Sequence, residues 1–332
     1  MGQRANYVII AEGRREVYYN HWRAGSVCKD VFWSPGHAVL FARRQRPVEP
    51  VGLLDEIWME GAFVIDCDKR RLTLFGGEDL RYEIILRRRY IELLQQTWAG
   101  WEVAWAYEGV IDIAKAAGFP QEVVLCDAAK PSSEFVHVDD GKFVNTVVTV
   151  RDKTGKMFVA QLRNLGENIV ASGTDVLNEV VARGSDVDVV VLNDVPRVGI
   201  HVDEAKRSVE FWSARDFPDA AARAEGAWSG WQAVFHQDRF EPQIETAAGR
   251  LRFEIPDPAT VVRNLRSAIV QEDRDSPAEY VERVGQIIGE HGQTKVSVNP
   301  DALVDAQCGP TLEIMGEVFD AALSATWAAR RP

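Results

Sequence analysis

Six residues in the first part of the chain are candidates for a binding site: His21, Trp22, Trp105, Tyr107, Glu108 and Asp112. Histidine titrates near neutral pH, a carboxylate can act as a general base, and aromatic rings can form the walls of a ligand site. If the site is catalytic, we expect Glu108 or Asp112 to serve as the base. No spacing in the chain assigns a nucleophile or an acid, so the catalytic residues stay unknown.

Packing is the alternative interpretation of the same aromatic residues. His21 and Trp22 belong to the segment VYYNHWRAG at 17–25, where a hairpin would bury apolar side chains in any case. Trp98 and Trp101 have counterparts later in the chain, which favours a role in the core. The part from Trp105 to Asp112 differs from its counterpart, so we expect it to contact a ligand.

Motifs for metal, nucleotide or nucleophile chemistry are missing from the sequence. The six histidines include no HExxH pair, and the four dispersed cysteines form no CxxC pair. A P-loop, a GxGxxG fingerprint and a GxSxG elbow are also absent. We therefore predict no cofactor, no metal and reduced, buried thiols. We favour the interpretation that the protein is not an enzyme, and an enzyme is the alternative.

Five blocks from the first part of the chain recur in the same order further on. Two of them show the match clearly: Trp98, Gly100 and Trp101 match Trp228, Gly230 and Trp231, and Asp66 to Leu74 match Asp203 to Phe211. Collinear matches of this kind predict a tandem duplication. The predicted domains are copy one at 6–126, a connector at 127–145, copy two at 146–256 and a C-terminal segment at 257–332.

The pattern of one copy predicts an α+β unit, ordered hairpin, helix, hairpin, helix, strand, helix, with antiparallel strands. Apolar alternation breaks at Glu12-Gly13 and at 66–69, which indicates two hairpin turns. Ser34 with Pro35 is typical of a helix start, and Gly118 of a helix end. Helical spacing over 86–98 and alternation over 101–105 complete the unit.

The C-terminal segment is predicted to be helical and to pack on the repeats. One helix begins at Asp257-Pro258, and a capping box at 276–279 begins another. A last helix at about 310–328 is expected to bury one apolar stripe, made of Met315, Phe319, Leu323 and Trp327.

Charge limits the partners of the chain. The net charge is −12, with 18 basic against 21 acidic residues in 1–145 and 20 against 29 in 146–332. This balance excludes nonspecific binding of nucleic acid, which needs a basic surface, and it permits a basic protein partner. No apolar run is long enough to cross a membrane, and the first residues do not resemble a signal peptide, so a cytoplasmic location is expected.

These observations favour a non-enzymatic protein-interaction protein of the cytoplasm that binds a basic partner. In its acidity, its ten tryptophans and its duplication, the chain resembles the immunity proteins that neutralise bacterial toxins. The resemblance implies a toxin-immunity or regulatory function; it involves no shared motif and assigns no family. The alternative is an enzyme or small-molecule-binding protein with a pocket between the two repeats or in copy one.

Overall fold

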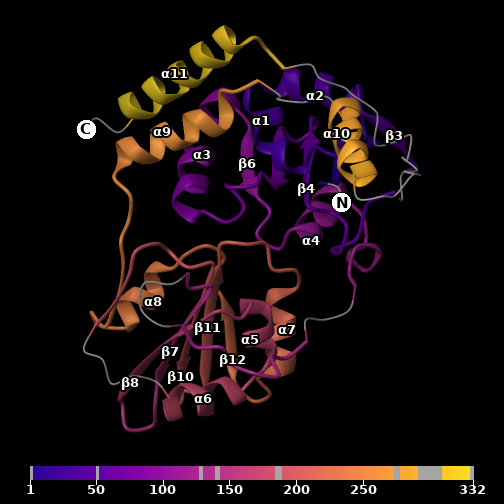
Figure 1. Cartoon of the computed structure of the whole chain (residues 1–332). Helices are drawn as coiled ribbons and strands as arrows, with labels where there is room; N and C mark the ends of the chain where they lie inside the picture. Colours follow the sequence, from indigo (N-terminus) through magenta and orange to yellow (C-terminus); the bar gives the residue numbers. More distant parts are fainter. Residues whose placement is uncertain are drawn as a thin grey trace. The chain divides into compact units, whose positions relative to one another are not determined.

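The computed structural model describes residues 3–49, 52–126, 130–138, 143–183, 189–272, 277–290 and 309–329 (Figure 1). The chain forms two compact units. Unit 1 comprises Met1–Leu80, Leu86–Cys126 and Ala259–Pro332, and unit 2 comprises Arg81–Ile85 and Asp127–Pro258. Unit 1 therefore takes segments from both sides of unit 2 in the sequence. Within the described ranges, no helix combines the length and apolar character that a membrane crossing requires.

Unit 1 contains a six-stranded sheet in the order β3-β2-β1-β4-β5-β6. Its strands are β1 (Ala5–Ala11), β2 (Arg14–Asn20), β3 (Arg46–Val48), β4 (Gly61–Asp66), β5 (Arg71–Phe75) and β6 (Glu102–Trp105). Strand pairs β1–β2 and β4–β5 are antiparallel hairpins. The hairpins join through a parallel β1–β4 pair, and β6 runs parallel to β5.

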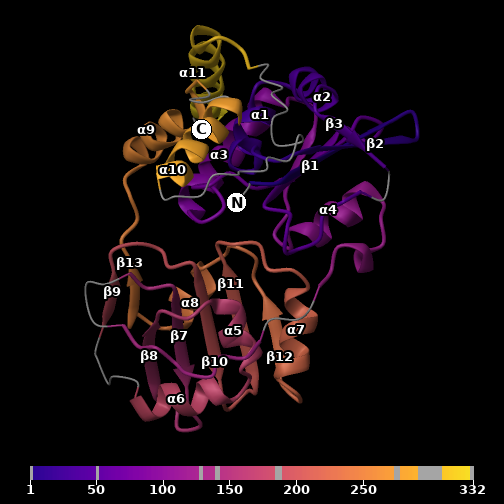
Figure 2. The same ribbon diagram turned by 45° about the vertical axis from the view of Figure 1, so that its right-hand side comes forward.

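Helices cover both faces of this sheet. They are η1 (Ala24–Ser26), α1 (Val27–Phe32), α2 (Pro35–Arg43), α3 (Ile84–Thr97), α4 (Val110–Ala117) and η2 (Gln121–Val123). On one face, Phe41 of α2 meets the Tyr7 ring edge to face at 5.4 Å. Neighbouring strand residues point to opposite faces, so Asn6 and Tyr7 lie on different sides. Figure 2 shows α2 and α4 on opposite sides of the β1–β2 hairpin.

Unit 2 contains a five-stranded sheet in the order β12-β11-β10-β7-β8 and a two-stranded parallel ribbon, β9–β13. Its strands are β7 (Thr146–Arg151), β8 (Met157–Leu162), β9 (Val190–Leu192), β10 (Val198–Asp203), β11 (Ser208–Ser213), β12 (Gln232–Phe235) and β13 (Leu251–Phe253). The helices are α5 (Gly166–Ala171), α6 (Asp175–Arg183), α7 (Ala220–Ala227) and α8 (Glu241–Thr246). In Figure 1, α5 and α7 lie on one side of the sheet and α8 on the other.

The sheets are mixed, so the expectation of an antiparallel unit is wrong for the strand pairs that join the hairpins and for those that add β6 and β12. In unit 2 the hairpins β7–β8 and β10–β11 are again joined by a parallel pair, β7–β10, and β12 again runs parallel to β11. The reason lies in the connections. Each parallel neighbour is reached through a long connection that contains helices, and such a crossover allows parallel pairing, whereas a tight turn does not. Mixed α and β content is confirmed.

Several local signals are confirmed by the structure. The Ser34 hydroxyl accepts the His37 N–H at 3.1 Å, and Pro35 is the first residue of α2. Asp66 and Asp203 accept the backbone N–H of Lys69 and Lys206 at 2.9 and 3.0 Å, which closes the two turns. Gly118 ends α4 in the left-handed conformation, with φ of 71°.

The Trp-x-Gly-Trp stretches adopt the same geometry in the two units. Trp98 Nε1 donates to Val31 O at 2.8 Å, and Trp228 Nε1 donates to Val170 O at 2.9 Å. Both indoles are fully buried. Gly100 and Gly230 have φ of 80° and 77°, a conformation that favours glycine. These tryptophans are core residues of their units.

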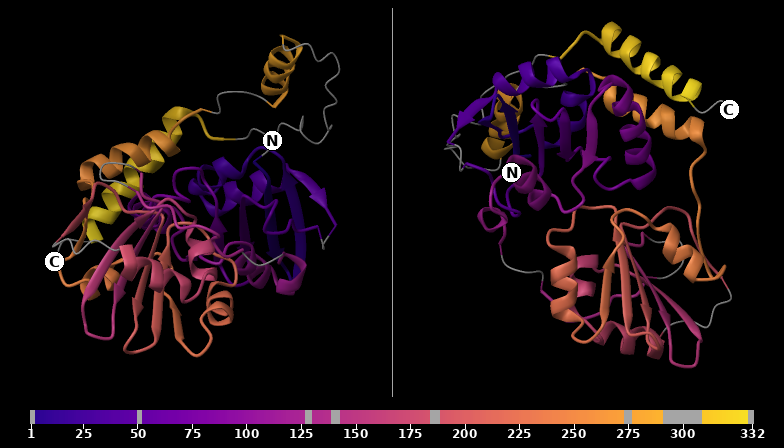
Figure 3. Two further views of the ribbon diagram at one scale, coloured as in Figure 1. Left: turned by 60° about the horizontal axis from the view of Figure 1, so that its bottom comes forward. Right: turned by 180° about the vertical axis from the view of Figure 1, so that it is seen from behind.

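Three helices follow β13: α9 (Pro258–Ile269), α10 (Pro277–Glu290) and α11 (Leu312–Ala329). Figure 3 shows α9 and α11 side by side, and Arg266 of α9 forms an ion pair with Asp320 of α11 at 3.2 Å. Phe319 stacks on Phe32 of α1 at 5.8 Å. Ser276, the first residue of the predicted capping box, lies outside the described residues.

The buried stripe of α11 differs from the expected one. Met315 and Phe319 are buried as expected, but Ala322 and Thr326 continue the stripe, while Leu323 is half-buried and Trp327 is exposed. The buried face of α11 therefore continues at helical spacing through the small residues Ala322 and Thr326. A close contact between helices has room for Ala322 but not for the larger Leu323. The spacing of apolar residues in the sequence does not contain this information.

Candidate functional site

All six predicted binding residues belong to unit 1, and they lie at the same end of the strands of its sheet. His21 and Trp22 follow the end of β2, and Trp105 is the last residue of β6. In the strand register, the last residues of β2, β5 and β6 lie at the same end of the sheet as the first residues of β1 and β4. Four strand spacings of about 4.8 Å separate β2 from β6, or roughly 19 Å. The six residues therefore form two groups.

The first group consists of Trp105, Tyr107, Glu108 and Asp112. Trp105 is buried, and the guanidinium of Arg87 in α3 lies 5.0 Å from its ring centroid and 5.8 Å from that of Tyr107. Such contacts stabilise a buried cation through the electron-rich faces of the rings. The fully buried Arg87 also donates to Leu80 O at 3.4 Å. The aromatic part of this group thus surrounds a cation of the chain itself.

The carboxylates of this group hold the start of α4. Asp112 Oδ2 accepts the backbone N–H of Glu108 at 2.9 Å, and Glu108 forms an ion pair with Lys115 at 3.1 Å. Burial raises the pKa of Asp112, against the lowering effect of that hydrogen bond. A carboxylate in the first turn of a helix that bonds a preceding N–H is a capping interaction. Both carboxylates have a structural use here.

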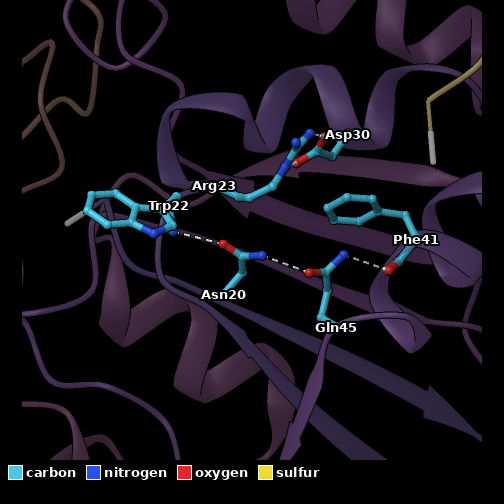
Figure 4. A network of polar contacts seen from close by, with 6 residues as sticks. All are labelled: Asn20, Trp22, Arg23, Asp30, Phe41 and Gln45. Atoms are coloured by element: carbon cyan, nitrogen blue, oxygen red, sulfur yellow. Dashed lines mark hydrogen bonds and ion pairs between the residues drawn. The ribbon is translucent and has the colours of Figure 1, made fainter. Parts of the chain in front are cut away.

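The second group consists of His21 and Trp22, and Trp22 lies in a network of polar contacts (Figure 4). The Trp22 N–H donates to Asn20 Oδ1 at 2.8 Å, and Asn20 Nδ2 donates to Gln45 Oε1 at 2.9 Å. Gln45 is anchored in turn to Phe41 O at 3.1 Å. The network fixes the loop after β2 against the end of α2.

His21 contacts both Trp22 of this network and Tyr19 of β2. Its Nδ1 lies 2.7 Å from the Tyr19 hydroxyl, and its ring meets the Trp22 ring edge to face at 4.7 Å. The hydrogen bond orients the Tyr19 ring on the sheet, next to the strand β3. His21 therefore holds the Tyr19 hydroxyl in place.

A hollow of about 330 Å³ opens beside Tyr19. We call it the arginine hollow; its lining residues are Arg4, Tyr19, Arg46, Val48, Gly52, Leu54 and Trp58. The Arg4 guanidinium lies 4.4 Å from the Trp58 ring centroid, and the Arg46 guanidinium lies 6.0 Å from that of Tyr19. Two cations, each on an aromatic ring, thus face one small space.

Asn6 of β1 holds the loop that forms one wall of the arginine hollow. Its buried side chain accepts the Leu54 N–H at 2.8 Å and donates to Gly52 O at 3.5 Å and to Tyr18 O at 3.0 Å. A buried amide with several partners fixes the backbone around it. The wall is therefore built into the fold.

None of the six predicted binding residues lines this hollow, although Tyr19 belongs to the same aromatic stretch at 17–25 as His21 and Trp22. The other lining residues come from the start of β1, from β3 and from the 52–58 loop, and none has a motif around it. Arg46 is the cross-strand partner of Tyr19, which connects it to the aromatic stretch. The sequence alone does not reveal this pairing, because it depends on β3 pairing with β2.

Unit 2 contains a buried polar cluster that the sequence also did not reveal. Gln243 of α8 donates to Thr149 Oγ1 at 3.1 Å and accepts from Trp212 Nε1 at 2.7 Å. Thr149 Oγ1 lies 2.9 Å from His201 Nδ1. The Nε2 of His201 is buried and has no hydrogen-bond partner among the described residues. In unit 1 the corresponding strand position, Val64, is apolar and lies between Val8 and Thr73.

The stability of unit 2 should decrease in acid because of His201. Burial lowers the pKa of His201 to about 4, although the charge of Glu210 opposes this. The unfolded chain takes up the proton near pH 6.5 and the folded chain only near 4. The contribution of neutral His201 to the free energy of unfolding should therefore be fully present above pH 6.5. The free energy of unfolding should decrease by about 3 kcal/mol between pH 6.5 and pH 4.

The measurement is urea unfolding of the wild type and of His201→Asn between these pH values. Asparagine keeps a polar atom for Thr149 but does not titrate, so the loss in acid should be smaller in the variant by that amount. Equal losses in the two proteins would show that other groups control the acid response.

A second hollow, of about 420 Å³, lies between α5 and α7 of unit 2. Its walls include Val170, Ala171, Phe217, Arg223 and Ala227. It is largely apolar and presents no pair of cations. In the described part of the chain, no group of three or more His, Cys, Asp or Glu side chains is placed to hold a metal ion.

Comparison of the chain with protein-family models, with curated proteins and with solved structures gave no match. The site must therefore be interpreted from its own geometry.

Proposed function

We propose that the chain is a binding protein that recognises a partner protein with a basic surface, and that it performs no catalysis. The observation that carries this proposal is an exposed apolar surface in unit 1, which we call the apolar ridge. It consists of Ile57, Trp58 and Val123, whose side chains are 65%, 49% and 45% exposed. Tryptophan is the residue most enriched in the energetic centres of protein interfaces.

Two hydrogen bonds bring the parts of the ridge together. The Glu56 N–H donates to Val124 O at 2.9 Å, and the Cys126 N–H donates to Glu56 Oε1 at 3.3 Å. The turn before Trp58 and the η2 segment therefore lie side by side. Apolar side chains that gather on a surface, unlike isolated ones, are typical of an interaction site.

The exposure of Ile57 and Trp58 is fixed by the local fold. Asp55 Oδ1 accepts the backbone N–H of Ile57 at 3.0 Å and that of Trp58 at 3.2 Å. The next residue, Met59, is buried. The turn thus inserts Met59 into the core and directs the two preceding side chains outward.

Carboxylates accompany the ridge: Asp55, Glu56 and Glu122 lie in the same two segments. Acidic groups around an apolar centre increase the association rate of a basic partner. The larger acidity of the second half of the chain acts in the same direction at long range. Toxin immunity and regulation are two functions of this kind, and the expected cytoplasmic location is part of the proposal.

The test is affinity capture from a cell lysate with the wild type and with the double variant Ile57→Lys/Val123→Lys. We expect a partner that is captured at low salt, is weakened at moderate salt, and is lost with the double variant. Leu40→Lys is the matched control, since Leu40 is equally exposed on α2, on the other side of the sheet. Absence of any partner at both salt concentrations, or retention by the double variant, would oppose the proposal.

We also infer that the two units arose by tandem duplication. Support comes from the identical order and directions of five strands and from the matching Trp98 and Trp228 hydrogen bonds. A small-molecule function in copy one is the second candidate, and the arginine hollow favours it.

A further inference from the structure

We propose that the arginine hollow binds a small planar anion, namely an aromatic or heterocyclic ring that carries a carboxylate or a phosphate group. This ligand site is distinct in chemistry from the apolar ridge, although Trp58 borders both. The proposal rests on the arrangement of two cations and two aromatic rings around one hollow of ligand size.

The cations are placed to recognise an anion. Arg46 and Tyr19 are cross-strand partners, and Tyr19 is also the partner of Asn6, so all three lie on one face of the sheet. Arg4 is two residues before Asn6 and shares that face. A guanidinium that lies over an aromatic ring keeps its N–H groups at its edge, where a carboxylate or phosphate can accept two of them.

The charges around Arg4 allow its guanidinium to bind an anion. Among the described residues, the Arg4 side chain forms no ion pair, and its guanidinium contacts the Trp58 ring. The carboxylate of Glu60 accepts the backbone N–H of Arg4 at 3.0 Å. In a chain of net charge −12, the two arginines supply the positive charge that an anion needs at this hollow.

The walls suit a flat ring. Trp58 exposes about half of its surface, and an indole can stack on the flat face of an aromatic ligand. Val48 and Leu54 add apolar surface. Since His21 holds the Tyr19 hydroxyl, the second ring is also fixed before a ligand arrives. Preorganised walls reduce the entropy lost on binding.

Two sources of this chemistry are distinguished by the choice of probe. Adenosine monophosphate represents nucleoside phosphates, and 1-naphthoate represents aryl carboxylates. Adenosine and inorganic phosphate supply the ring and the anion alone. Each probe is titrated into the full chain by calorimetry, and protection of Trp58 from acrylamide quenching is followed by comparison with Trp58→Leu.

We expect one saturable site for one of the two planar anions, with adenosine and phosphate each bound at least tenfold more weakly. Arg4→Gln and Arg46→Gln should each weaken binding about tenfold or more, because each removes a charge-assisted hydrogen bond. Arg14→Gln is the matched control: it removes an equal charge at the other end of the β1–β2 hairpin, and binding should not change.

Tighter binding of the monophosphate would assign the hollow to nucleoside phosphates, and tighter binding of naphthoate would assign it to carboxylates. Three results would overturn the proposal: neither anion binds saturably, adenosine binds as tightly as its phosphate, or binding persists in both arginine variants. Arg46 is exposed on a short edge strand, so Arg46→Gln should fold even if Arg4→Gln does not. Partner capture through the apolar ridge should be unaffected by Arg46→Gln.

Discussion

Gly199→Ala should destabilise unit 2 by about 3–5 kcal/mol, because the added methyl group overfills a packed interior and breaks a buried hydrogen bond. Gly199 is the second residue of β10, and a Cβ on it would overlap Gln243 Oε1 and Trp212 Nε1. These two atoms are hydrogen-bonded to each other at 2.7 Å. The absence of a side chain at Gly199 is what allows α8 to approach the sheet.

Hydrogen exchange at the β7 and β10 amides, together with urea unfolding, measures this effect within unit 2. Gly226→Ala is the matched control, since Gly226 lies inside α7 with open space at its Cβ position. Alanine there should be neutral or stabilise by up to about 1 kcal/mol. A Gly199→Ala protein as stable as this control would mean that α8 does not pack as described.

Trp98→Ala and Trp228→Ala should each cost about 3–5 kcal/mol, and each should act on its own unit. Both side chains are fully buried, and each donates to a carbonyl of a neighbouring helix, so truncation leaves a void and an unsatisfied carbonyl group. Exchange protection of β1 should fall with Trp98→Ala, and that of β7 with Trp228→Ala.

The control for the tryptophan variants is Trp327→Ala on α11, where more than half of the side chain is exposed. Its effect should stay within about 0.5 kcal/mol. If Trp98→Ala cost less than about 1 kcal/mol, the indole would not be the core residue that its burial indicates.

Local chemistry explains which parts of the fold could be predicted from the sequence. The turns at Asp66 and Asp203, the cap at Ser34 and the end of α4 at Gly118 depend on residues within four positions of each other. Such interactions act before any tertiary contact exists. They therefore leave a signal in the sequence that does not depend on the rest of the chain.

Pairing between distant strands left no comparable signal. Val8 and Val64 are parallel neighbours, but their apolar side chains would suit an antiparallel neighbour equally well. For the same reason the short strands β3, β9 and β13 were not expected. Strand order and direction follow from the packing of crossover helices, which a pattern of period two does not contain.

The candidate site shows the same division. Residue types pointed to His21 and Trp22 in the sequence, but the arginine hollow is lined by their neighbour Tyr19 and by residues of other segments, among them Arg4, Arg46 and Trp58. Sequence differences between the two predicted copies pointed to Trp105–Asp112, whereas the structure shows a polar difference at His201, where unit 1 has a valine.

The discontinuity of unit 1 has a consequence for how the protein is made. A ribosome synthesises residues 127–258 before residues 259–332, which include the α11 residue Phe319 that stacks on Phe32. The polypeptide of unit 2 is therefore complete before residues 259–332 are made, and unit 1 lacks that segment during the interval. At an elongation rate of about 5–20 residues per second, this interval lasts at least several seconds. During that time Phe319 of α11 does not yet cover Phe32 of α1.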